Sequence, residues 1–314
     1  MIAYLFRRLL SLIVSCFLIS VLVFLVMHVI PGDPAQIMLG TEADPDTLSA
    51  LRTQLGLDRP LHVQYGAWVR GILTGHLGQS LRYHVPISGL ILSRLEVTVP
   101  LAFLAMLIAV VIGLPAGLYA ATHRSGPGDY GVIAVSQVGL SIPSFWLGIL
   151  LMLVFCTTLR WLPAGGFLPW SESILGALRS LLLPALALGL IRGAVVARLS
   201  RSSLLDVLGR DYIRTARGKG VREIAVLWKH ALRNALIPIV TVIGMQFSTL
   251  LAGAIIIENV FYLPGLGRLL FQSIGQRDLP VVQDIVVLMA VLVVGMNLII
   301  DLAYAMLDPR IRLE

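Results

Sequence analysis

Six long apolar runs constrain this 314-residue chain more than any other feature of its sequence. They cover roughly residues 9–30, 98–121, 131–157, 181–199, 236–257 and 283–306. A helix needs about 20 apolar residues to cross a bilayer, and its backbone satisfies its own hydrogen bonds inside lipid. Only 13% of the residues are charged, against about 25% in a soluble domain. The sequence therefore predicts an all-α membrane protein with six transmembrane helices.

The first and third runs each carry a local signal. Arg7 and Arg8 precede the first run, as in a secretory signal peptide, but the run is too long for one and no cleavage site follows. We therefore expect a retained anchor helix. The third run contains Pro143, which favours tilt or a kink.

The charges between the runs predict the orientation of the chain. Segments on the side of the N-terminus carry fourteen basic and six acidic residues, while those on the other side carry nine of each. Cytoplasmic loops are enriched in Lys and Arg. Six spans place both termini on one side, so the N and C termini are predicted to be cytoplasmic. Residues 31–97 then form a long extracytoplasmic insertion between helices 1 and 2.

That insertion contains one clear helix signal. The stretch DPDTLSALRTQLGL predicts a short helix with Asp46 or Thr47 as its N-cap and an end at Gly56. No low-complexity linker or internal repeat divides the chain. We expect residues 1–314 to form a single membrane domain.

A basic strip lies between the fourth and fifth runs. From Arg210 to Arg233 it contains seven basic residues, opposed only by Asp211 and Glu223. Asp211 is placed to cap a short helix, and Gly220 permits a sharp turn before a second, amphipathic helix. The apolar positions of that second helix are spaced by threes and fours: Ile224, Leu227, Trp228, Ala231, Leu232, Ala235 and Leu236.

Three interpretations of the strip compete. It can bind lipid headgroups, bind nucleic acid, or dock a cytoplasmic partner. A nucleic-acid binder spreads its charge over a soluble surface, whereas this charge lies in gaps between apolar runs. Charge alone leaves the other two open, although a bare lipid anchor needs neither the two glycines nor the paired helix.

The strip also resembles the cytoplasmic coupling loop of ABC importer permeases, in the branch for dipeptides, oligopeptides, nickel and glutathione. That branch commonly reads D-Y-x-R-T-A-R-A-K-G and then H-A-L-R-N-A-L-x-P. Gly218 replaces the usual alanine. The matching residues are Asp211, Tyr212, Arg214, Thr215, Ala216, Arg217, Lys219 and Gly220, then His230, Ala231, Leu232, Arg233, Asn234, Ala235, Leu236 and Pro238.

The resemblance extends over nearly the whole chain. SIPSFWLG at 141–148, ENVFYLPGLGRLL at 258–270 and LDPRIR at 307–312 are similar to the same branch. PGDPA at 31–35 and LGLDRPLHVQY at 55–65, together with the long insertion, resemble its B-type subunit.

The resemblance implies a permease subunit of a bacterial inner-membrane importer, forming half of a translocation path. Residues 200–235 would be the coupling loop that docks an ATPase. The implied partners are a homologous second permease, two ABC ATPases, an extracytoplasmic solute-binding protein and membrane lipid, with no nucleic acid. The alternative is a gradient-driven secondary transporter or channel, which predicts ionisable groups or broken helices at the membrane centre.

No enzyme or cofactor site is predicted in this chain. Residues 218–220 read GKG but lack the following Ser or Thr and the upstream glycine of a P-loop. We therefore expect ATP and Mg only on the partner ATPases. The six histidines show no metal-ligand spacing, and no Ser-His-Asp set or carboxylate pair can be argued from spacing.

Polar and small residues within the runs predict contacts between helices. Asn297 and Asp301, one turn apart, should hydrogen-bond across helices or line the path. Arg192 lies about two turns from the inner end of its run, so its side chain should extend to the interface. Gly113 and Gly117 form a G-x-x-x-G pair for close helix approach. We expect a structural role for Glu258.

Overall fold

The computed structural model describes residues 2–29, 34–40 and 44–307. Most residues in these ranges are helical, and their only extended pairing is an isolated bridge between Gln79 and Pro86. The all-α prediction is confirmed. The chain divides into two compact units, one comprising residues 98–263 and the chain from 295 on, the other residues 2–97 and 264–294.

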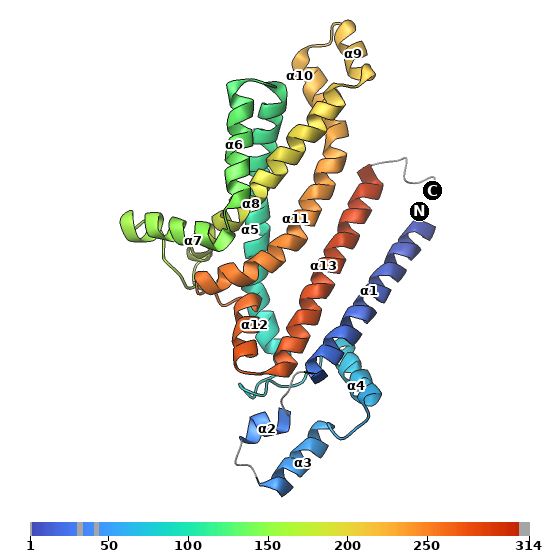
Figure 1. Ribbon diagram of the computed structural model, residues 1–314, viewed down its shortest axis with the longest axis vertical. Helices are drawn as coiled ribbons and strands as arrows, with labels where there is room; N and C mark the ends of the chain where they lie inside the picture. Colours follow the sequence, from blue (N-terminus) through green and yellow to red (C-terminus); the bar gives the residue numbers. More distant parts are fainter. Residues whose placement is uncertain (1, 30–33, 41–43, 308–314) are drawn as a thin grey trace. The chain divides into compact units, whose positions relative to one another are not determined.

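Five helices are each long and apolar enough to cross a membrane (Figure 1). They match five of the six predicted runs: α1 (Ile2–Val29), α5 (Ile87–Thr122), α8 (Ile174–Leu208), α11 (Arg233–Val260) and α13 (Leu279–Leu307). Helix α5 begins eleven residues before its predicted run at residue 98, so it takes in the end of the expected insertion. Pro100 and Pro115 lie inside it without ending it, as helices in membranes tolerate.

The third predicted run is broken rather than kinked. Helix α6 (Pro127–Ser141) is followed by α7 (Ser144–Met152) and the π-helical segment η1 (Leu153–Thr158), with a bend of 99° at the break. Ile142 is extended because the residue before a proline disfavours the helical conformation. The described residues therefore contain five single spans, or six if the bent pair forms one.

Helices α5 and α8 approach closely in the first unit. A Cβ atom at Gly113 would meet the backbone oxygen of Gly193, and one at Gly117 would meet that of Ala197. Only glycine allows two helix backbones to approach this closely. The predicted role of the Gly113–Gly117 pair is confirmed.

Glu258 is also structural, as expected. It is fully buried, and the hydroxyl of the buried Thr98 donates to its Oε1 at 2.6 Å. The bond joins the end of α11 to α5 within the first unit.

The second unit contains the short helices α2 (Pro34–Leu39), α3 (Pro45–Leu55), α4 (Leu61–Thr74) and α12 (Leu266–Gly275). Helix α3 is the helix predicted in the insertion, and it ends at Gly56 with a φ of 70°, as expected. The predicted N-cap, Asp46 or Thr47, was wrong by two to three residues, because the N-cap is Asp44. Asp44 accepts the backbone N–H of Thr47, because Pro45 already occupies the first helical position.

Two aspartates are buried in the second unit. Asp278 accepts hydrogen bonds from the hydroxyl of Ser80 and from the backbone N–H groups of Leu81 (3.2 Å) and Arg82 (3.3 Å). Trp68 donates its indole N–H to Oδ1 of Asp284 at 2.8 Å, beside a cavity of about 690 Å³. The buried Oδ2 of Asp284 has no hydrogen-bond partner among the described residues.

Candidate functional site

The basic strip forms a compact turn between α8 and α11. Helix α9 (Asp211–Gly218) follows α8 after a two-residue connection, and α10 (Glu223–Ala225) leads into the π-helical segment η2 (Val226–Leu232) and α11. Residues 223–260 thus form one helix of 38 residues. The site is therefore a short helix joined by one turn to the start of a long helix (Figure 1).

A single buried side chain attaches α9 to the rest of the unit. Ile213 is fully buried in a cluster with Ala121, Leu204 and residues of the following helix, and Ala216 packs against the same cluster. Burying an isoleucine contributes about 1.5–3 kcal/mol. This contact orients α9 so that its polar face points outward.

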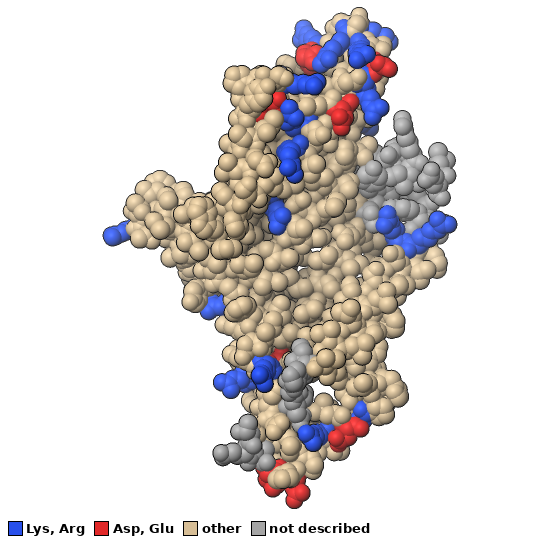
Figure 2. Space-filling model, in the orientation of Figure 1, with Lys and Arg blue, Asp and Glu red and all other residues tan. Residues whose placement is uncertain are grey.

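Most of the predicted coupling residues are exposed together. Ala216 and His230 are half-buried. The exposed ones are Asp211, Tyr212, Arg214, Thr215, Arg217, Lys219, Gly220, Arg233 and Asn234. Figure 2 shows Lys and Arg side chains gathered over this end of the unit. The structure thus brings these residues onto one accessible surface, which we name the loop surface.

Gly220 makes the sharp turn that its sequence position predicts. Its φ is 75°, a left-handed conformation that costs other residues about 1–2 kcal/mol. The backbone N–H of Gly220 donates to the carbonyl of Arg217, and that of Val221 donates to the carbonyl of Ala216. These two bonds close the end of α9.

An ion pair bridges the turn. Arg217 donates through Nε and Nη2 to the two carboxylate oxygens of Glu223, at 3.0 and 2.5 Å. The hydrogen bonds that the Arg217 guanidinium donates to this carboxylate raise the pKa of the guanidinium above its ordinary value. The bidentate geometry fixes the orientation of α9 relative to α10.

A second contact joins α9 to the helix that follows. The side-chain amide of Asn234 donates to the hydroxyl of Tyr212 at 3.0 Å and to the carbonyl of His230 at 2.8 Å. Both halves of the sequence motif therefore meet in space. The bond from Asn234 to Tyr212 holds α9 against the start of α11.

Two sequence-based details of the strip were wrong. Asp211 is the first residue of α9 and caps nothing with its side chain, because the N-cap position belongs to Arg210. Ile224 and Trp228 were expected on the apolar face but are mostly exposed. Ala231 and Ala235 of the predicted face do point into the cluster, and Val226 joins them, whereas the π turns of η2 turn Trp228 away from it.

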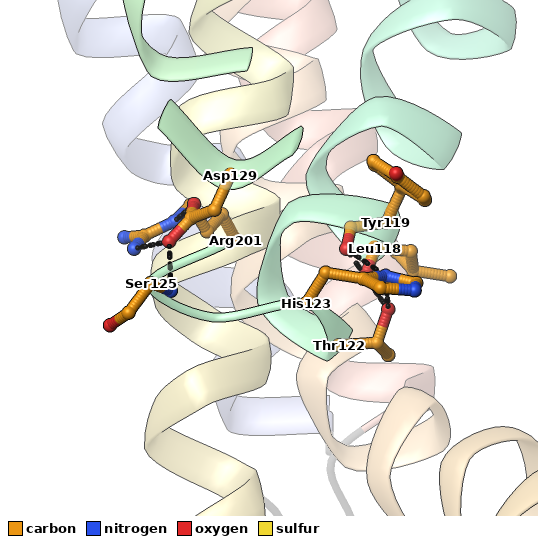
Figure 3. Close-up of polar contacts among 7 residues, drawn as sticks. All are labelled: Leu118, Tyr119, Thr122, His123, Ser125, Asp129 and Arg201. Carbon is orange, nitrogen blue, oxygen red and sulfur yellow. Dashed lines mark hydrogen bonds and ion pairs between the residues drawn. The ribbon is translucent and has the colours of Figure 1, made fainter. Parts of the chain in front are cut away.

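A buried ion pair beside the strip was missed by the sequence reasoning. Arg201 of α8 donates to both oxygens of Asp129, at 2.5 and 2.8 Å, and the backbone N–H of Ser125 donates to the same carboxylate at 2.9 Å (Figure 3). In the sequence, Asp129 is only one of the six acidic residues on the side of the N-terminus. No spacing links residues 72 positions apart, so only the packing of α6 on α8 reveals the pair.

The polar residues within the spans have mixed outcomes. Asn297 accepts a hydrogen bond from the hydroxyl of Ser248 at 3.3 Å, which is the predicted contact across helices. The side chain of Asp301 lies outside the described residues. Arg192 does not extend to an interface along α8. It donates instead to Oε1 of Gln246 on α11 at 3.3 Å, because α8 continues to Leu208 and places Arg192 near its middle.

Among the described residues, no group of three or more His, Cys, Asp or Glu side chains could hold a metal ion. The loop surface is an exposed, basic protein surface that continues into long apolar helices.

Two family descriptions match the sequence. Residues 113–313 match the family described as binding-protein-dependent transport system inner membrane component, and residues 1–102 match its N-terminal domain. The chain belongs to this family. The permease is thus a multi-pass subunit of an ABC importer of the bacterial inner membrane, and the gradient-driven alternative falls away.

Full-length relatives support the same assignment. The permease is 44% identical to a putative peptide transport system permease protein of Brucella abortus, over 100% of both chains. It is also 44% identical to the glutathione transport system permease protein GsiC of Salmonella typhimurium, over 99% of both chains.

Two solved structures share its fold. An inward-facing crystal form of the MetNI methionine ABC transporter has a TM-score of 0.59 at 21% identity, covering 70% of the permease and 96% of that chain. An amino acid ABC transporter crystallised with histidines has a TM-score of 0.53 at 20% identity, covering 69% and 94%.

Proposed function

We propose that the permease forms half of a translocation path for a peptide, glutathione or a related small solute. The names of its 44%-identical relatives support this solute class. The other half would come from a homologous second permease. In this arrangement both termini and residues 200–235 are cytoplasmic, residues 31–97 are extracytoplasmic, and residues 1–314 act as one permease domain.

We further propose that the loop surface docks an ABC ATPase. The observation that carries this proposal is the construction of α9: Ile213 anchors it, while Arg214, Thr215 and Lys219 stay exposed. A lipid anchor would expose an apolar face toward the bilayer. On α9 the exposed face is polar and is held by the Arg217–Glu223 pair, as suits a groove on a protein partner, while the exposed apolar side chains Ile224 and Trp228 lie on the following helix.

Two ATPases would supply the energy, because the ATP and Mg would be bound by them and not by this chain. Closure of the ATPases would move α9, and the bonds from Arg217 and Asn234 would pass that movement to residues 223–260. The helices of the path would then change their access between the two sides of the membrane.

The insertion would receive an extracytoplasmic solute-binding protein. Helices α3 and α4 and the loop held by Asp278 give residues 44–86 a defined structure suited to such a contact. Exposed polar residues along α3 leave its surface available to a protein partner.

Co-purification tests the docking proposal. The tagged permease is extracted in mild detergent after co-expression with its second permease and ATPases, and the bound ATPase is quantified. Gly220→Arg should lose the ATPase, because it strains the turn and adds bulk to the loop surface. Gly66→Arg is the matched control, because it places the same side chain in open space on α4.

The two outcomes are distinct. Loss of the ATPase from Gly220→Arg alone, with both variants monodisperse, supports docking at the loop surface. Retention of the ATPase by Gly220→Arg at the wild-type ratio would contradict it and would leave the strip as a lipid anchor.

A further inference from the structure

Arg192 is a charged side chain in the middle of an apolar helix. It lies near the centre of the 35 residues of α8, which is long and apolar enough to span the membrane. Arginine at such a position costs about 2.5–3.5 kcal/mol or more, so it normally faces a polar interior or a water-filled path. The position therefore demands a compensating partner.

The described residues offer Arg192 only one weak partner. Its Nη1 donates to Oε1 of Gln246 on α11 at 3.3 Å, and no carboxylate of the described chain lies within ion-pair distance. A guanidinium has five N–H donors. The remaining donors have no acceptor among these residues, while Asp129 and Glu223 are already paired with Arg201 and Arg217.

The guanidinium is only partly covered. Gly253 of α11 packs closely on α8, since a Cβ atom built on it would lie 3.1 Å from the side chain of Leu188 and 3.9 Å from Nη2 of Arg192, yet Arg192 itself is only half-buried. Thr249 donates to the carbonyl of Gln246 at 2.8 Å and also approaches its Oε1 at 3.4 Å. Gln246 is thereby fixed as the acceptor that orients Arg192 from one side.

We propose that Arg192 binds a carboxylate group of the transported solute through the part of its guanidinium that α11 leaves uncovered. Carboxylates match the planar fork of a guanidinium with two parallel hydrogen bonds. Peptides and glutathione carry such groups. The inference therefore rests on the proposed solute class and adds a residue that would select for an anionic group. Gln246 is a positioning residue in this scheme.

The decisive variant is Gln246→Glu. It places a carboxylate at the atom that Arg192 already contacts, so it would occupy the guanidinium in place of the solute. Arg192→Gln removes the charge itself. Arg198→Gln is the matched control, because it makes the same change on an exposed residue of the same helix.

The assay measures uptake of a labelled tripeptide and of labelled glutathione. The complete importer, with its second permease, ATPases and binding protein, is placed in lipid vesicles. Arg192→Gln and Gln246→Glu should each lower uptake by about tenfold or more, the factor carried by one hydrogen bond to a charged group. Gln246→Glu should keep or raise the thermal midpoint, and Arg198→Gln should transport like the wild type.

A structural role predicts the opposite pattern. If Arg192 only stabilises the helix pair, the new ion pair in Gln246→Glu leaves uptake at the wild-type rate, and that result overturns the inference. If the wild-type importer takes up neither solute, the proposed solute class fails, and the inference falls with it. If the wild type takes up the solutes and the variants do so equally well, the solute class stands and only the role of Arg192 fails.

Discussion

Arg201 of α8 and Asp129 of α6 form a two-bonded ion pair in the first unit, with the Asp129 side chain 2% exposed and that of Arg201 23% exposed. The backbone N–H of Ser125 adds a third bond to the carboxylate. The pair therefore fixes the turn between α5 and α6 against α8, about two and a half helical turns before the strip begins.

Removing the charge of Asp129 should destabilise the permease. Asp129→Asn leaves the Arg201 guanidinium without a carboxylate, and loss of one partner from such a pair is costly. We expect the midpoint of thermal unfolding in detergent to fall by about 5 °C. Asp206→Asn, an exposed site on α8, is the control and should unfold like the wild type. Equal midpoints for the two variants would show that the pair contributes nothing.

Added side chains between α5 and α8 should separate these helices. Gly113→Ala and Gly117→Ala each place a methyl group against the backbone oxygen of α8, and overpacking of this kind costs about 1–3 kcal/mol. Gly131→Ala, where a Cβ meets nothing within 4 Å, should be tolerated. Yield of folded protein and thermal midpoint distinguish them, and wild-type behaviour of Gly113→Ala would contradict the close approach.

The Arg217–Glu223 pair should act on coupling more than on stability. Both side chains are largely exposed, so the pair contributes up to about 1 kcal/mol and weakens in salt. Arg217→Glu should reduce the ATPase activity that the binding protein stimulates in the assembled importer. Adding Glu223→Arg to it should restore part of that activity. A double variant as impaired as the single one would mean that Arg217 acts by contacting the ATPase itself.

Trp68→Phe should destabilise the permease, because it leaves the buried carboxylate of Asp284 without its hydrogen bond. The change removes the only bond to Asp284 from the described residues, which costs about 1–3 kcal/mol. Adding Asp284→Leu should recover most of the loss, because both polar groups are then gone. Trp161→Phe, an exposed site, should be neutral. Thermal midpoints of the four proteins measure the effect.

The sequence predicts what depends on local pattern. Apolar length locates the long helices, Gly56 and Gly220 locate turns that need a left-handed residue, and Gly113 with Gly117 locates a close helix contact. Each of these signals lies within a few residues of the feature it predicts.

The sequence does not predict what depends on distant packing. The pair of Asp129 with Arg201 joins residues 72 positions apart, and the bond between Trp68 and Asp284 joins residues 216 apart. The exposed Trp228 was misplaced for a related reason. Helical periodicity assumes 3.6 residues per turn, whereas η2 has wider turns.

The π segment η2 has a consequence for changes in chain length. Each α-helical residue turns the chain by about 100°, so one residue inserted between Arg233 and Glu258 would point every later side chain at the wrong neighbour. The wider turns of η2 hold a surplus residue. Deleting one residue from Val226–Leu232 would tighten these turns into an ordinary helix and leave both ends facing as before. The 38-residue helix can therefore lose a residue within this short stretch. The loop surface at one end and the bond between Glu258 and Thr98 at the other would keep their relative orientation.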